Sequence, residues 1–337
     1  MLNIGVIGAG YWGPNIIRNF AIMKESSVLK CCDIRQERLD LIKSLYPRIE
    51  TSTDVEDIIT SRDIDAVAIV TPVSTHYELA RACLKEGKHV LIEKPMCSSV
   101  NECKDLIEIA KQKNKIIMVD HTFVYHPAIK KCKELIEGGE LGDSMLYFDS
   151  VRINLGLFQH DVNVIWDLAP HDLSIMDYLI EEKPIQVSAY GKSHFNLPVE
   201  DIAYITIHFE SNLTAHFHVN WLAPVKIRRT IISGSSKMLV YDDMEPSEKI
   251  KIYDKGVTLI NDSIYETLIN YRTGDIWAPK LSQKEALKEE IEHFIDCIMN
   301  NKKPITDGED GLRVVRLLSA ADRSIKENSS WISVRET

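Results

Sequence analysis

The first twenty residues contain the feature that most constrains the fold, an apolar run followed by three closely spaced glycines. Leu2 to Ile7 suits a buried parallel strand, and Gly8, Gly10 and Gly13 follow in the spacing Gly-x-Gly-x-x-Gly before a helical stretch. Gly8 permits a tight turn, Gly10 lets the backbone approach a pyrophosphate, and Gly13 lets helix and strand pack closely. The anion would then lie on the helix N-terminus. Spacing alone does not separate such a dinucleotide-binding loop from an ordinary glycine turn.

A second strand-like run ends in a carboxylate, Asp33, about twenty residues past the last glycine. A ribose hydroxyl acceptor is expected at this distance; the alternative is a solvated acid at a strand end. We expect NAD rather than NADP, because Asp33 would repel a 2′-phosphate, although the nearby Arg35 opposes this preference. Tyr11 and Trp12 lie within the loop and are counted with it as cofactor-binding, and so is Arg35 beside Asp33.

Strand-like and helical patterns alternate from Leu2 to about Asp120, which predicts a doubly wound parallel sheet, the Rossmann arrangement. In such sheets ligands bind beyond the carboxyl ends of the strands. The residues expected to line that cleft, besides the glycine loop and Asp33, are Thr71, Pro72, His76, Glu93 and Lys94. For Thr71 to His76 the alternative is a proline-containing turn with an exposed histidine.

After His126-Pro127 and a helix, the pattern changes to successive strands, several with alternating apolar and polar residues. This predicts two domains, residues 1–122 for the cofactor and residues 123–337 as an α+β domain with a large, open, mostly antiparallel sheet. Capping boxes are expected at Ser99 with Glu102 and at Ser282 with Glu285, each opening a helix.

Composition excludes several classes of protein. A chain of 337 residues with 45% hydrophobic residues can form two cores, and a net charge of −10 argues against a general nucleic-acid binder. The N-terminus enters the first strand without a signal-like segment, and no apolar run reaches membrane-spanning length, so we expect a cytoplasmic protein without membrane contact. The seven cysteines include no Cys-x-x-Cys pair and are expected to be reduced and buried.

Two short stretches carry the chemistry, Glu93-Lys94-Pro95 and the run from Asp167 to Asp172, Asp-Leu-Ala-Pro-His-Asp. With the glycine triplet, Asp33 and Thr71-Pro72, their order resembles that of the glucose-fructose oxidoreductase/inositol dehydrogenase family, known as Gfo/Idh/MocA. The resemblance covers essentially the whole chain and implies an NAD-dependent oxidoreductase. Within the family, the sequence looks most like dehydrogenases that oxidise nucleotide-linked amino sugars or their uronates at C3.

The resemblance implies that Lys94, Asp167 and His171 are catalytic. Because Pro170 fits only the first turn of a helix, we expect Asp167 near the N-cap and His171 within one turn of it. A helix N-terminus disfavours imidazolium, so His171 would be neutral and able to act as the general base. Lys94 would orient the substrate hydroxyl and stabilise a developing alkoxide, and Asp167 would fix His171. The alternatives are a Glu93–Lys94 ion pair and an Asp167 that only caps a helix.

Substrate contacts are less constrained by the sequence. Many members of the family have glycines before the catalytic Asp, whereas this chain has Asn163 to Trp166, so the substrate side is expected to be bulkier. The side chains suited to a phosphate or carboxylate are Arg152, Asn154, Lys226, Arg228 and Arg229, with a solvated surface as the alternative. His208, His216 and His218 recur on adjacent strands, but no carboxylate or cysteine completes a ligand set, so no metal is expected.

The predicted function is oxidation of a secondary hydroxyl, by preference C3, of a nucleotide-linked N-acetylhexosamine or its uronate with NAD. The alternatives are an inositol or free-sugar dehydrogenase and, from another class, a sugar-sensing regulator without turnover. A homodimer or homotetramer built on the open face of the second sheet is also expected, because Ala203, Ile205, Ile207 and Phe209 alternate with polar residues.

Overall fold

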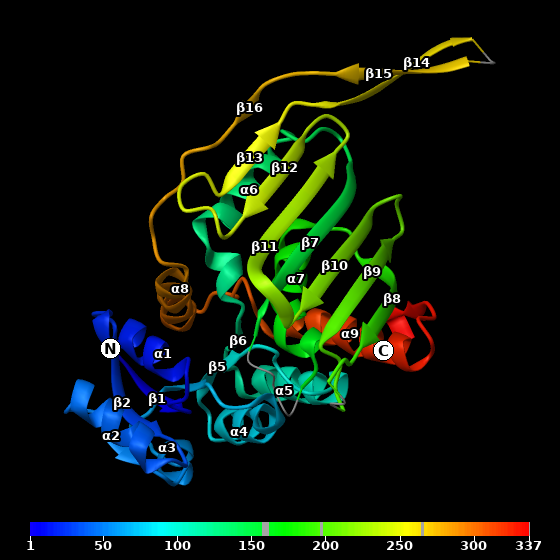
Figure 1. Ribbon diagram of the computed structural model, residues 1–337. Helices are drawn as coiled ribbons and strands as arrows, with labels where there is room; N and C mark the ends of the chain where they lie inside the picture. The colour runs from blue at the N-terminus through cyan, green and yellow to red at the C-terminus, as the bar shows by residue number, and fades with distance from the viewer. Residues whose placement is uncertain (157–161, 196–197, 264–265, 337) are drawn as a thin grey trace. The chain divides into compact units, whose positions relative to one another are not determined.

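The computed structural model describes residues 1–156, 162–195, 198–263 and 266–336. The chain forms two compact units (Figure 1). Unit 1 contains Met1–His126 and Lys284–Arg316, and unit 2 contains Pro127–Gln283 and Leu317–Thr337. The segment Lys284–Arg316 falls in the second of the two domains expected from the sequence, yet it packs with the first.

Unit 1 is built on a six-stranded parallel sheet in the order β3-β2-β1-β4-β5-β6. Its elements are β1 Leu2–Ile7, α1 Gly13–Ile22, β2 Ser26–Cys32, α2 Gln36–Leu45, β3 Glu50–Ser52, α3 Glu56–Ile59, β4 Ala66–Ile69, α4 Val73–Lys85, β5 His89–Glu93, α5 Val100–Lys113, β6 Ile117–Asp120, the 3₁₀ helix η1 Thr122–Tyr125 and α8 Ala286–Asn300. The predicted Rossmann sheet is confirmed. The strand order reverses between β1 and β4, and ligands bind beyond the strand ends at such a switch point.

The two expected capping boxes have different outcomes. At α5, the Glu102 backbone N–H donates to Ser99 Oγ (3.3 Å) and the Ser99 N–H donates to Glu102 Oε2 (3.1 Å), so this box is confirmed. The box at Ser282 is wrong, because α8 begins after Glu285, whose side chain makes no capping hydrogen bond. Glu285 instead pairs with Arg18 of α1, so a tertiary ion pair takes the carboxylate that the local pattern assigned to a cap.

Unit 2 contains a nine-stranded sheet in the order β16-β13-β12-β11-β7-β10-β9-β8-β17, in which β7 and β10 pair in parallel and the other neighbours are antiparallel. Its elements are α6 Pro127–Glu137, β7 Met145–Leu155, α7 Val164–Leu179, β8 Pro184–Lys192, β9 Ile202–Phe209, β10 Thr214–Asn220, β11 Leu222–Gly234, β12 Met238–Asp242, β13 Ile250–Tyr253, β16 Ile276–Trp277 and β17 Ile332–Ser333, with β14 Gly256–Ser263 and β15 Glu266–Arg272 as a separate hairpin. The helix α9, Gly308–Lys326, contributes residues to both units.

One face of the nine-stranded sheet is covered by helix α7, which packs against β7, β9 and β10 (Figure 1). On β9, Ala203, Ile205, Ile207 and Phe209 are buried, while the alternate residues remain at least partly exposed. The predicted alternation is therefore confirmed for this strand, and it gives the sheet one apolar face and one face with polar and aromatic side chains.

Two expectations from composition can be compared with the structure. All seven cysteines are free thiols with buried side chains. Among the described residues, no helix combines the length and the apolar character that crossing a membrane would require.

Candidate active site

The three glycines after β1 have different geometries, and each geometry matches the role expected for it. Gly8 has φ +102°, and a Cβ there would lie 2.3 Å from the Val70 carbonyl oxygen. A Cβ on Gly13 would lie 2.3 Å from the Gly8 carbonyl oxygen, so helix α1 packs against the turn with no room for a side chain. At Gly10 the nearest atom to a Cβ would be Arg35 Nη2, at 3.8 Å. The backbone is open at Gly10, and the loop fits a dinucleotide pyrophosphate.

Asp33 follows β2 and holds the glycine loop from that side. Its Oδ2 accepts from the Ala9 backbone N–H at 2.7 Å, and its Oδ1 accepts from the Arg35 N–H at 2.9 Å. Asp33 is 8% exposed, so the alternative of a solvated acid is wrong. A carboxylate has about four acceptor sites, and one left on Oδ2 is suited to the predicted ribose hydroxyl. Tyr11 is 90% exposed at the loop surface, and Trp12 is half-buried.

His76 connects the loops that follow β4 and β5. Its Nε2 lies 2.8 Å from the Thr71 carbonyl oxygen and its Nδ1 lies 3.0 Å from the Pro95 carbonyl oxygen. Burial lowers the pKa of His76; the two carbonyls oppose this, and the charge of Lys94 adds to it. His76 is 1% exposed, so the alternative of an exposed histidine is wrong. The imidazole fixes the carbonyl of Pro95, the residue after Lys94, and Lys94 is half-buried just beyond the end of β5.

Helix α7 carries Asp167 and His171 one turn apart, on one helix face. Asp167 lies in the first turn of α7, near the N-cap as expected. The N-cap itself is Asn163, which accepts from the backbone N–H groups of Ile165 and Trp166, both at 3.1 Å. Pro170 therefore lies inside the helix rather than in its first turn. Asp167 is free of the capping role, and its Oδ2 accepts from Trp221 Nε1 at 2.9 Å.

The N-terminus of α7 is tied to the C-terminal helix α9. Asn163 Nδ2 and Trp166 Nε1 donate to the two oxygens of Asp322, at 3.0 and 2.7 Å. Burial raises the pKa of Asp322, while the two donors act in the opposite direction. Val164, Ile165 and Trp166 are all buried, so the bulk that replaces the glycines seen in many members of the family packs inside unit 2.

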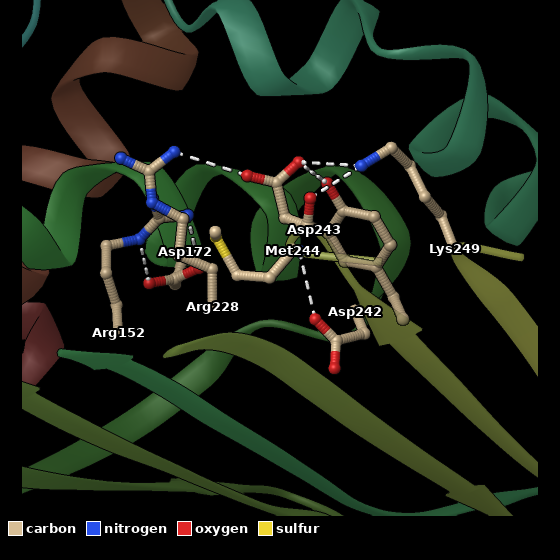
Figure 2. A network of polar contacts seen from close by, with 8 residues as sticks. Arg152, Asp172, Arg228, Asp242, Asp243, Met244 and Lys249 are labelled. Carbon is tan, nitrogen blue, oxygen red and sulfur yellow. Dashed lines mark hydrogen bonds and ion pairs between the residues drawn. The ribbon is translucent and has the colours of Figure 1, made fainter. Parts of the chain in front are cut away.

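Asp172, directly after His171, is tied to Arg152 of β7 by two hydrogen bonds (Figure 2). Arg152 Nε donates to Oδ2 at 2.6 Å, and Nη2 donates to Oδ1 at 2.9 Å. Both side chains are buried, at 2% and 4% exposure. Burial opposes the charge of Arg152, but Asp172 holds its pKa above the ordinary value. One edge of the predicted anion-binding guanidinium is therefore occupied by this bond, which orients α7.

Arg228 lies beside Arg152 in the sheet register and donates to Asp243 Oδ2 at 3.2 Å (Figure 2). Burial alone would raise the pKa of Asp243, but Arg228 and Lys249 hold it below its usual range. Of the other predicted substrate residues, Asn154 is half-buried on β7 and Lys226 is exposed on β11.

The three histidines on adjacent strands lie among aromatic rings. Tyr204 stacks on His218 with ring centroids 4.5 Å apart, and His208 stacks on Trp331 at 4.0 Å. Within the described part of the chain, no three His, Cys, Asp or Glu residues are placed to hold a metal ion.

Trp221, Asp172 and Asp322 were missed as supports of the α7 residues. Asp172 could have been found from the sequence. An arginine on the buried face of a strand needs an acidic partner, and Asp172 directly follows the predicted base. Trp221 and Asp322 lie 54 and 156 residues from their partners, and nothing local indicates these pairs.

A parallel sheet with an open glycine loop at its switch point defines unit 1 as a dinucleotide-binding domain. Comparison with family models agrees: residues 2–121 match the oxidoreductase family model for an NAD-binding Rossmann fold, and residues 133–334 match its C-terminal alpha/beta domain. The chain belongs to the Gfo/Idh/MocA family of oxidoreductases and is an NAD-dependent dehydrogenase.

Several relatives have defined activities. The chain is 24% identical to the myo-inositol 2-dehydrogenase of Thermotoga maritima, with 98% of each chain covered. It is 27% identical to the UDP-N-acetylglucosamine 3-dehydrogenase of Acidithiobacillus ferrooxidans, covering 93% of this chain and 94% of the relative. A crystal structure of the latter enzyme superposes with a TM-score of 0.81 at 25% identity, over 97% and 98% of the two chains. An Agrobacterium radiobacter oxidoreductase in complex with NAD+, L-tartaric acid and magnesium shares the fold, with a TM-score of 0.83, 18% identity and 99% of each chain covered.

Proposed function

We propose that the protein oxidises a secondary hydroxyl of a sugar or polyol with NAD, and that its substrate is a nucleotide-linked N-acetylhexosamine or the corresponding uronate, oxidised at C3. The observation that carries the proposal is the arrangement of α7. Asp167 and His171 share a helix face, while Trp221 fixes the first and the Arg152–Asp172 pair fixes the turn that holds the second.

In the proposed reaction, His171 accepts the proton of the substrate hydroxyl as general base. Lys94 orients the same hydroxyl and stabilises the charge that develops on its oxygen. Asp167, held by Trp221, orients His171. The glycine loop and Asp33 would hold the dinucleotide, whose nicotinamide ring supplies the hydride acceptor.

Steady-state kinetics test these roles. His171→Ala should lower kcat roughly 10²- to 10⁴-fold with little change in KM, and Lys94→Ala should cost at least as much because two transition-state effects are lost. Both variants should keep most of their NAD affinity, because neither residue is proposed to hold the adenosine half of the dinucleotide. His208→Ala, on the opposite face of the sheet from α7, is the matched histidine control. A His171→Ala protein with near-normal kcat would refute the assignment.

The substrate is tested by thermal-shift screening of UDP-sugars, inositols and free sugars with NAD present, since a ligand of the native state raises the melting temperature. The second candidate is an inositol dehydrogenase, favoured by the similarity to the Thermotoga enzyme. A shift with inositols and none with UDP-sugars would select it. Retention of Lys94, Asp167 and His171 argues against a regulator without turnover, and NAD reduction with any hit would exclude that class.

We also propose that the open face of the nine-stranded sheet is the surface for self-association. This face carries the stacked Tyr204 and His218, and Tyr204 is 38% exposed. A broad face with aromatic side chains is suited to such contact. Light scattering at micromolar concentration should give a dimer or tetramer, and a species of 38.4 kDa would reject the proposal.

A further inference from the structure

The glycine loop has a second point of attachment that its sequence spacing does not predict. Trp12 lies between Gly10 and Gly13, and its Nε1 donates to Asp120 Oδ2 at 3.0 Å. Asp120 ends β6, the edge strand that is separated from β1 by β4 and β5. Asp33 holds the same loop through Ala9 on the other side. The loop is therefore fixed by carboxyl groups that follow two different strands of the sheet.

Trp12 is also the N-cap residue of α1, and its side chain makes no capping hydrogen bond. The Trp12 carbonyl accepts from the backbone N–H groups of Asn15 and Ile16, at 2.9 and 3.3 Å. The conformation of Trp12 thus determines where α1 begins and where its first N–H groups point, and these are the groups that meet a pyrophosphate. The indole bond to Asp120 adds a side-chain contact that fixes this position.

Asp120 is itself held in place by neighbouring side chains. Its exposure is 3%, and Thr122 Oγ1 donates to its Oδ1 at 2.5 Å. Glu290 of α8 is 0% exposed and lies beside Asp120 and Thr122, within reach of a side-chain hydrogen bond to each. Two adjacent buried acids repel each other when both are charged, so the pair favours a form in which one of them keeps its proton. Burial and the neighbouring Asp120 raise the pKa of Glu290 well above its ordinary value, so Glu290 is the acid that keeps the proton.

We infer that Asp120 is a positioning residue for the NAD-binding loop: it holds the Trp12 indole, and the neutral carboxyl group of Glu290 fixes the orientation of Asp120. An anchored loop is already ordered before NAD arrives, so less conformational freedom is lost on binding. The inference rests on NAD binding, which family membership establishes, and not on the identity of the substrate.

The test is NAD affinity, measured by isothermal titration calorimetry on the full chain. Trp12→Phe keeps an aromatic ring but removes the donor, and Asp120→Leu removes the acceptor. Each should weaken NAD binding roughly three- to tenfold, the range for one lost hydrogen bond, and the double variant should be no weaker than either single variant. Glu290→Leu should lower NAD affinity by about half as much, on a logarithmic scale, as Asp120→Leu does. Glu290→Gln keeps a neutral donor and should bind NAD as the wild type does.

Trp277→Phe in unit 2 is the matched tryptophan control, and Glu292→Leu on the exposed side of α8 is the control for the helix.

In kinetics the Trp12 and Asp120 variants should raise the KM for NAD while kcat at saturating NAD is retained, a separation that general damage to the core would not give. Additive losses in the double variant, or a Glu290→Gln protein as weak as Glu290→Leu, would overturn the inference. If Asp120→Leu does not fold, Trp12→Phe with wild-type NAD affinity would still overturn it. A wild-type protein that bound no NAD would contradict the cofactor assignment as well.

Discussion

Each unit buries a pair of ionisable side chains beside its predicted site residues, and the two pairs are neutralised differently. In unit 2, Arg152 and Asp172 carry opposite charges and share two hydrogen bonds. In unit 1, Asp120 lies beside another acid, Glu290, and a retained proton takes the place of a cation. Burial, together with Asp120 and Glu93, raises the pKa of Glu290 well above its ordinary value.

The comparison shows that a buried polar pair can orient site residues in either unit, but that the two pairs affect the free energy of unfolding in different ways. The ion pair needs both partners, because removing one leaves a buried charge. The acid pair needs a proton that the unfolded chain releases at neutral pH, so it lowers the free energy of unfolding as the pH rises. These two dependences can be separated experimentally.

The largest effect is expected when the ion pair is broken on one side. Asp172→Ala should lower the free energy of unfolding by about 3–5 kcal/mol, because the Arg152 guanidinium then remains buried without its carboxylate. The double variant Arg152→Met, Asp172→Leu should recover most of this stability. Urea denaturation at pH 7 measures both. A double variant as unstable as the single variant would mean that packing, and not charge, accounts for the loss.

A smaller effect of the opposite sign is expected at Glu290. Below about pH 4.3, the ordinary pKa of Glu, the side chain is protonated in both folded and unfolded chains. At higher pH only the unfolded chain ionises, so stability is lost as the pH rises towards the raised folded-state pKa. Glu290→Gln has no such proton and should be more stable than the wild type by about 1 kcal/mol at pH 8, with a smaller difference at pH 5.

Thermal denaturation at the two pH values tests this sign, with Glu292→Gln, whose side chain is 47% exposed, as the control. A Glu290→Gln protein that is less stable than the wild type at pH 8 would mean that the folded state holds Glu290 as a carboxylate.

The smallest effect is expected at the edge of the unit 2 network. Arg228 is 30% exposed, and Asp243 has a second cation at 3.7 Å, Lys249. Arg228→Gln should therefore lower the free energy of unfolding by about 1 kcal/mol or less, and added salt should reduce the difference further. A loss of stability as large as that of Asp172→Ala would show that the exposure of Arg228 and the second cation beside Asp243 do not limit the contribution of this pair.

The sequence was informative where local chemistry determines structure. The glycine spacing, the apolar strands and the Ser99 capping box each depend on residues close together, and they predicted the parallel sheet and the loop geometry. It was less informative where distant residues compete for the same group. Glu285 pairs with Arg18, 267 residues away, instead of closing a capping box. The anchor from Trp12 to Asp120 spans 108 residues, and no periodicity encodes that contact.

The return of Lys284–Arg316 to unit 1 has a consequence for synthesis of the chain. The ribosome completes the Rossmann strands early, but helix α8, which supplies Glu290 and the Glu285 partner of Arg18, emerges only after most of unit 2 has been made. Unit 1 therefore cannot complete its core until α8 has been synthesised. A fragment ending near residue 126 should expose the apolar surfaces of α1 and η1 that α8 covers.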